Sequence, residues 1–134
     1  MLLLICLMTV MFGTTALATN NNPFTNVNVF STESKTNSTV VHSGAQKNQN
    51  PADTKYYITL TLNQWSGQNL HFQSFKYQTT TTISSTATAT GTGSGKGNYN
   101  SGKNSYDRYD LRARADIQPG ESAKVGKISG RWDP

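Results

Sequence analysis

Cysteine and histidine are scarce in this 134-residue chain, which holds one Cys and two His. The single thiol, Cys6, lies in an apolar stretch at the N-terminus, so residues 19–134 cannot form a disulfide. Zinc sites usually take three or four protein ligands, and His42 and His71 are too few to supply them. The sequence predicts no disulfide scaffold, no metal site and no cofactor.

Long hydrophobic runs are also missing. The apolar stretch Leu2–Phe12 spans 11 residues, well short of the roughly 20 that a membrane-spanning helix needs. Small residues follow it and end in Ala16-Leu17-Ala18, the A-x-A pattern of signal-peptide cleavage. We expect a signal peptide over 1–18, cleaved after Ala18, and one secreted domain over 19–134 without a transmembrane anchor. No Lys or Arg precedes the apolar stretch, so we expect the translation start to lie a few codons upstream.

Catalytic signatures are lacking as well. The chain has no G-x-S-x-G nucleophile elbow, and its seven acidic residues include several that alternate with arginines. The stretch Gly91–Asn98 (GTGSGKGN) fails as a phosphate-binding loop, because Gly97 stands after Lys96 where Ser or Thr is needed. We expect no enzymatic activity, and a small hydrolase with an unrecognised site is the weakest of the alternatives.

What the chain does have is strand-like alternation of apolar and polar residues. Tyr56–Leu62 (YYITLTL) alternates perfectly, and Phe24–Phe30 and the short Thr39–His42 have the same character. Tyr106–Ile117 also alternates, and its predicted outward positions are Asp110, Arg112, Arg114 and Asp116. Because opposite charges on one face of a strand usually pair across strands, we expect these residues to form ion pairs.

Two further strands change their apolar phase. In Leu70–Tyr77 the phase slips by one residue, which predicts a β-bulge near Gln73-Ser74. In Lys124–Trp132 it shifts between Val125 and Ile128, with bulges expected at Gly126 and Gly130. The turn at Trp65–Leu70 predicts a hairpin between the strands that flank it, and Tyr106–Trp132 predicts a second, C-terminal hairpin.

Thr and Ser dominate residues 79–94, which leaves two interpretations. A polar strand over about Gln78–Thr90 is favoured, since Thr is β-branched and this stretch has no Pro; a disordered segment is the alternative. The glycine-rich Gly91–Asn104 that follows is expected to be a loop. About seven short strands and no helical periodicity predict an all-β fold, a small antiparallel β-sandwich rather than a barrel.

Positive charge is in excess, with 12 Lys and Arg against 7 Asp and Glu. The surplus is spread along the chain and permits binding to anionic polymers or lipid surfaces. Near the C-terminal half, aromatic and basic residues interleave, a pattern suited to stacking on rings while cations meet phosphates. The candidate binding residues are Lys96, Tyr99, Lys103, Tyr106, Arg108, Arg112 and Arg114. The competing interpretation is that Tyr109 belongs to the core and the others form an ordinary surface.

Two functions remain open on these grounds. The first is a secreted, non-enzymatic β-domain of a Gram-positive bacterium that binds a cell-surface or extracellular component. An anionic cell-wall polymer or a membrane surface would be its partner, and no specific nucleic acid is expected. The alternative is a secreted antimicrobial, bacteriocin-like or toxin-like protein that acts on neighbouring cells. Nothing in the residues separates the two.

Trp132 gives a direct test of the predicted core. We expect its ring to close the core at the last strand, so Trp132→Ala should lower the free energy of unfolding by about 3–5 kcal/mol, as large-to-small core changes do. Thermal denaturation measures the loss. A melting temperature within about 2 °C of the parent protein would place Trp132 at the surface instead.

Overall fold

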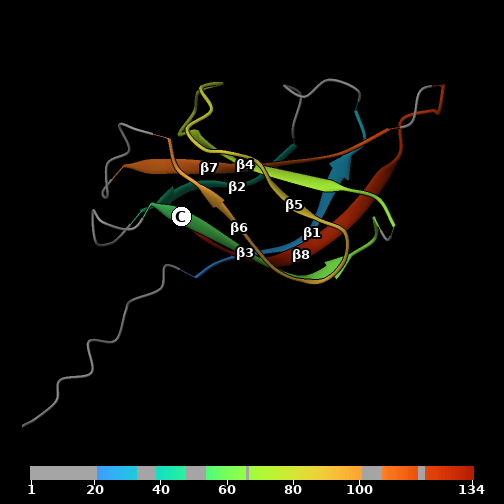
Figure 1. Cartoon of the computed structure of the whole chain (residues 1–134), viewed down its shortest axis with the longest axis horizontal. Coiled ribbons are helices and arrows are strands. Elements are labelled where there is room, and N and C mark those ends of the chain that lie inside the picture. Colours follow the sequence, from blue (N-terminus) through green and yellow to red (C-terminus); the bar gives the residue numbers. More distant parts are fainter. Residues whose placement is uncertain (1–20, 33–38, 48–53, 66, 101–106, 118–119) are drawn as a thin grey trace, which may run out of the picture.

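The computed structural model describes residues 21–32, 39–47, 54–65, 67–100, 107–117 and 120–134. Within these ranges the chain forms strands and no helix (Figure 1). The expected signal peptide and its cleavage site at Ala18 lie outside the described residues. The eight strands are β1 (Asn22–Phe30), β2 (Thr39–Gln46), β3 (Lys55–Asn63), β4 (Leu70–Lys76), β5 (Ala87–Ala89), β6 (Gly93–Asn98), β7 (Arg108–Ala115) and β8 (Val125–Asp133).

The strands form two antiparallel sheets of four strands that pack face to face as a sandwich (Figure 1). Sheet A has the order β1-β8-β3-β6, and sheet B has the order β2-β7-β4-β5. The predicted all-β sandwich is therefore confirmed, with one strand more than the seven or so expected.

The chain crosses from one sheet to the other at almost every connection. Only β4 and β5 are consecutive strands that also pair with each other. Both predicted hairpins are wrong for this reason: β3 and β4 lie in different sheets, and so do β7 and β8. Alternation in a sequence indicates that a strand has one buried face, but it does not say which strand lies beside it.

The core lies between the sheets and depends on aromatic side chains. The inward residues of β3 and β7 are buried as the alternation predicts, among them Tyr56, Ile58, Tyr109 and Leu111. Trp132 of β8 is fully buried, as expected, and its ring meets that of His42 edge to face at 5.9 Å between centroids. Tyr99 stacks on Tyr56 and Tyr109 at 5.6 Å each, so a column of rings joins the two sheets.

The predicted bulge in β4 is absent. β4 pairs with β7 in unbroken register from Leu70 to Lys76, so the phase slip has another cause. Ser74 takes an inward, fully buried position, and Phe75 points to the outer side of sheet B. There the guanidinium carbon of Arg112 lies 4.5 Å from the centre of the Phe75 ring and covers it. The phase slip in the sequence therefore reflects an apolar residue, Phe75, on the outer face and not a β-bulge.

The irregularities of sheet A also lie elsewhere than predicted. β8 runs regularly, and the extra residues stand opposite it, between Phe24 and Val27 of β1 and between Leu60 and Leu62 of β3. Gly130 is needed for close packing, because a Cβ at this position would overlap the carbonyl oxygen of Thr59.

The segment from residue 78 to residue 100 differs most from expectation. The expected polar strand reduces to the three residues of β5 and isolated bridges at Thr82 and Ser84. The expected loop contains β6, which pairs with β3 over its whole length. Gly97 of β6 lies under the Tyr56 ring, which a Cβ there would overlap. The glycines of this segment thus let a strand pass close to a buried aromatic residue.

The Tyr56 hydroxyl connects the sheets directly. It shares its proton between the carbonyl oxygens of Phe72 (3.0 Å) and Ser85 (2.8 Å). It also accepts a hydrogen bond from the amide of Ala87, at 3.1 Å. Burial raises the pKa of Tyr56 to about 12. One hydroxyl of sheet A therefore satisfies three backbone groups of sheet B and the segment before β5.

Removing this hydroxyl should be costly. In Tyr56→Phe the buried amide of Ala87 loses its acceptor, so we expect the free energy of unfolding to fall by about 1–3 kcal/mol. Urea denaturation measures the loss. Tyr57→Phe is the matched control, since the Tyr57 side chain points outward and is 42% exposed. Equal stability of the two variants would show that the hydroxyl bridge contributes nothing.

Candidate binding surface

The outer face of sheet B carries the three predicted arginines, Arg108, Arg112 and Arg114, on alternate residues of β7. Each one is already bound by the protein. Arg108 donates from Nε to the Gly44 carbonyl at 3.1 Å and stacks on the Tyr77 ring. Arg112 donates to the Thr79 carbonyl at 2.7 Å. Each guanidinium group thus donates to a group of the protein itself and helps to hold the neighbouring segment in place.

Asp110 lies between Arg108 and Arg112 but is buried, with 3% of its surface exposed. Its Oδ1 accepts hydrogen bonds from the Ser43 hydroxyl at 2.8 Å and the Gly44 amide at 3.0 Å, and its Oδ2 accepts one from the Gln78 amide at 3.0 Å. The expected ion pair is replaced by these neutral donors. The carboxylate therefore anchors the end of β2 and the turn after β4.

A second polar cluster crosses sheet B near the end of β7. His71 Nε2 lies 2.7 Å from Asp116 Oδ2, and its Nδ1 lies 3.0 Å from the Thr88 hydroxyl. Arg114 Nη1 donates to Asp116 Oδ1 at 2.6 Å. His71 points outward as predicted, but only 16% of its side chain is exposed. The chain of contacts ties β5, β4 and β7 together, and here the expected pairing of Asp116 with arginine is confirmed.

Two of the remaining predicted residues, Lys96 and Tyr99, do not lie with the arginines. Lys96 is exposed on β6, in the other sheet. Tyr99 is buried in the ring column, and Lys47 lies over its ring at 4.8 Å, so Tyr99 is not at the surface as expected. Lys103 and Tyr106 lie outside the described residues. The seven predicted binding residues therefore do not form one surface.

His42 also departs from expectation. The sequence suggested a surface histidine, but the register of β2 turns His42 inward opposite Leu111. Burial lowers the pKa of His42, against the opposing influence of the Asp110 charge. The neutral ring therefore packs against Trp132 as part of the core.

A different surface emerges on the outer face of sheet A. Tyr57, Lys96, Lys127 and Arg131 all point outward there, and we call these four residues the basic face. Tyr57 pairs with Lys96 of β6 on one side and with Asp133 of β8 on the other. The three cations are exposed, and no described residue forms an ion pair with any of them within 4.0 Å.

The cations of the basic face are spread rather than clustered. Strand spacing places the Cα atoms of Lys96 and Arg131 about 12 Å apart, and those of Arg131 and Lys127 about 13 Å apart. Asp133 is the one acidic residue in the four strands of sheet A. Burial raises the pKa of Asp133, while the charge of Arg131 opposes the shift. The face as a whole keeps a positive excess.

Such a surface offers groups that can bind an external molecule. The exposed phenol ring of Tyr57 can stack on sugar or other planar groups, with Lys96 beside it and Arg131 diagonal to it for phosphate or carboxylate. Sequence reasoning found Lys96 but missed Tyr57, Lys127 and Arg131. The outward parity of Tyr57 in Tyr56–Leu62 was available, but only the pairing of β6 and β8 beside β3 brings the cations to it.

Among the described residues, no group of three or more His, Cys, Asp or Glu is placed to hold a metal ion. No helix in the described part of the chain is long and apolar enough to cross a membrane. Comparison with known proteins finds no match to a protein family, to a curated protein or to a solved structure.

The Asp116 cluster predicts a pH dependence of stability. Partial burial raises the pKa of Asp116, but hydrogen bonds and charge from His71 and Arg114 together outweigh it and hold this pKa below its usual value. A carboxyl whose pKa is lower in the folded state stabilises the fold above its unfolded pKa and loses this effect as pH falls through the folded pKa. Stability should therefore decline below about pH 4.

Asp116→Asn should remove part of this decline. We expect the variant to be less stable than the parent protein at pH 7 and to lose less stability on going to pH 2. Urea denaturation across this range measures both quantities, with Asp107→Asn, an exposed position, as the control. Parallel curves for Asp116→Asn and the parent protein would contradict the assignment.

Proposed function

We propose that this protein is a secreted, non-enzymatic binding module that attaches to an anionic polymer of the bacterial cell surface through the basic face. The observation that carries the proposal is the outer face of sheet A, where the exposed Tyr57 ring has Lys96 directly across on β6 and Arg131 diagonally across on β8, with Lys127 further along β8. None of these three exposed cations forms an ion pair with a described residue. Export is supported by the signal-peptide pattern that ends at Ala18.

The contrast between the two sheets supports the choice of face. On sheet B, the arginines of β7 are bound to carbonyl groups, to aromatic rings or to Asp116, and two carboxylates lie among them. On sheet A, Lys96 lies beside Tyr57 and Arg131 lies beside Thr59, and neither cation forms an ion pair with a described residue. Cations that the protein does not use are available to an external anion.

The spacing of the cations favours an extended polymer over a single small anion. Positions about 12 Å apart cannot converge on one phosphate, but they can contact separate charged groups along a chain. At 0.1 M ionic strength the Debye length is about 10 Å, so each contact acts nearly independently and is weakened by added salt. Binding of this kind gains affinity from the number of contacts.

Neutralising the two cations beside Tyr57 tests the proposal. Lys96→Gln combined with Arg131→Gln should weaken binding to a soluble glycerol phosphate polymer about tenfold, as the loss of two surface charge contacts predicts. Isothermal titration calorimetry at low and high salt measures the affinity. The matched control is Lys76→Gln with Lys124→Gln, which removes the same charge from other parts of the surface and should change binding much less.

Two results would contradict the proposal. Equal losses in both double variants would show that net charge alone drives attachment, and no binding to the polymer at low salt would remove the proposed ligand class. Growth of bacterial cells exposed to the protein should be followed in parallel. Inhibition of growth would favour the antimicrobial alternative over a passive binding module.

A further inference from the structure

The free edge of β6 differs from the other sheet edges. β1 is interrupted between Phe24 and Val27, where Asn26 has a φ of 51°. β2 carries two register shifts, and β5 is only three residues long. β6 has six residues, pairs with β3 in unbroken register and contains no Pro. Bulges, Pro and very short strands are common means of blocking an edge, and β6 has none of them; its one protective feature of the usual kinds is the exposed Lys96.

Backbone groups of β6 point away from the sheet. The Asn98 amide donates to the Ser85 hydroxyl at 2.9 Å, and the Asn98 carbonyl accepts from the Ser85 amide at 2.8 Å, so both face away from β3. Because the direction alternates along an antiparallel strand, the backbone groups of Lys96 and Ser94 face the same way. No described residue bonds to the amide or carbonyl of either one.

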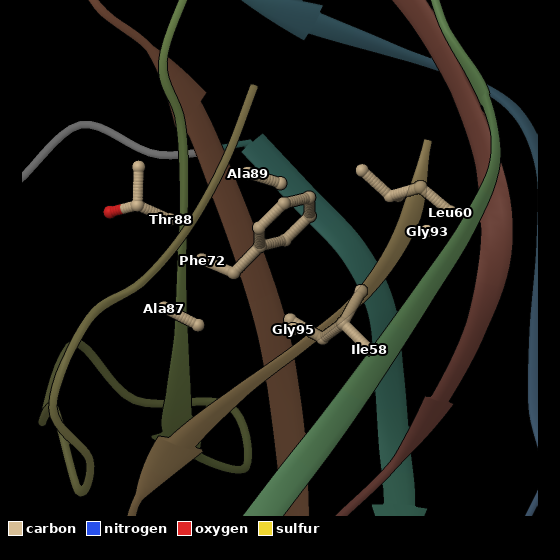
Figure 2. Close-up of a pocket in the computed structure, with 8 residues that line it drawn as sticks. All are labelled: Ile58, Leu60, Phe72, Ala87, Thr88, Ala89, Gly93 and Gly95. Atoms are coloured by element: carbon tan, nitrogen blue, oxygen red, sulfur yellow. The ribbon is translucent and has the colours of Figure 1, made fainter. Parts of the chain in front are cut away.

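A small apolar crevice lies beside this edge, between β6 and β5. Figure 2 shows the Phe72 ring pointing into it, with Ile58 and Leu60 of β3 on one side and Ala87 and Ala89 of β5 on the other. Gly93 and Gly95 of β6 form its rim and add no side chain to fill it. Its free volume of about 10 Å³ is close to that of one water molecule, so only a small apolar side chain would fit over it.

The charge of Lys96 limits which strands could pair with the β6 edge. Lys96 projects from β6 beside the open edge and carries no ion pair with a described residue. A second copy pairing through the same edge would bring two Lys96 side chains into one short antiparallel ribbon, which like-charge repulsion disfavours. A strand with Asp or Glu beside Lys96 would gain a cross-strand pair instead.

We propose that the β6 edge binds an extended acidic peptide segment, which adds to sheet A as a further strand. The amides and carbonyls of Ser94 and Lys96 form its backbone hydrogen bonds. Its acidic residues lie beside Lys96, and its small apolar residues lie over the crevice lined by Phe72. The interaction is separate from polymer binding on the basic face, with Lys96 the one residue that both would contact.

A peptide of alternating Glu and Ala, about nine residues long, is the probe, since its two faces match Lys96 and the crevice. Fluorescence anisotropy of the labelled peptide should show binding to the full protein. Ser94→Pro removes an amide that points away from β3 and so leaves the β3 pairing intact. We expect it to weaken peptide binding about tenfold or more.

Three controls make the result specific. Ser94→Ala removes the hydroxyl that contacts Thr59 at 3.1 Å but keeps the amide, so it should bind the peptide like the parent protein. A peptide of alternating Lys and Ala should not bind. Lys127 lies on the basic face away from β6, so Lys127→Gln should reduce polymer binding and leave peptide binding unchanged. These comparisons separate failure of this proposal from failure of the proposed function.

Hydrogen exchange gives a second measurement that does not depend on the folding of Ser94→Pro. The amides of Ser94 and Lys96 should exchange quickly in the free protein and slowly with the Glu-Ala peptide. Absence of peptide binding, equal binding by Ser94→Pro, or unchanged exchange at these two amides would overturn the proposal. A dimer in sedimentation analysis that Ser94→Pro abolishes would also overturn it, in favour of a second copy as the occupant.

Discussion

The hydrogen bonds of the Tyr56 hydroxyl are the point on which the packing of the two sheets depends. Residues 19–134 contain no cysteine, so no disulfide links the two sheets, and they are held together by buried apolar surface, which is not directional. The three bonds of Tyr56 add direction, because they fix β3 of sheet A against β4 and the start of β5 in sheet B. Gly97 lets β6 lie across the same ring. The backbone pairing of β6 with β3 and the close approach of Gly97 to this ring together place the β6 edge and its crevice.

The same packing explains which parts of the fold could be predicted. Alternating residues in Tyr56–Leu62 and in Tyr109–Ala115 specify one buried face each, and that is enough to predict strands and a sandwich. Strand pairing is different, because partners such as β1 and β8 are separated by nearly the whole chain. Local turn residues suggested hairpins, while burial of both inner faces favoured crossings between the sheets.

The errors in β4 and β6 have two distinct physical causes. Phe75 is covered by the Arg112 guanidinium on the outer face, so an apolar side chain was buried without belonging to the core. Glycine-rich sequence usually indicates a loop, but in β6 it meets the need for a backbone that passes close to Tyr56. Both contacts join residues far apart in sequence, and no local pattern reveals them.

The candidate surface was only partly predictable for a related reason. The pattern of interleaved basic and aromatic residues predicts a binding surface that includes β7. In the structure, Arg108 and Arg112 of this strand donate hydrogen bonds to carbonyl groups of the protein itself. The exposed cations of the basic face belong to β6 and β8, which flank β3 only because of the order of strands in sheet A. A basic side chain is available to a ligand when it makes no hydrogen bond or ion pair within the protein. Composition alone does not show which side chains these are.

The position of β8 in sheet A also affects how the domain folds. β8 is the last strand of the chain, yet it lies inside sheet A with β1 on one side and β3 on the other. Until residues 125–133 have been synthesised, β1 has no partner in its own sheet and β3 pairs on one edge alone. Both pairings join segments far apart in the sequence, and contacts of such long sequence separation form slowly, so we expect sheet A to close late in folding.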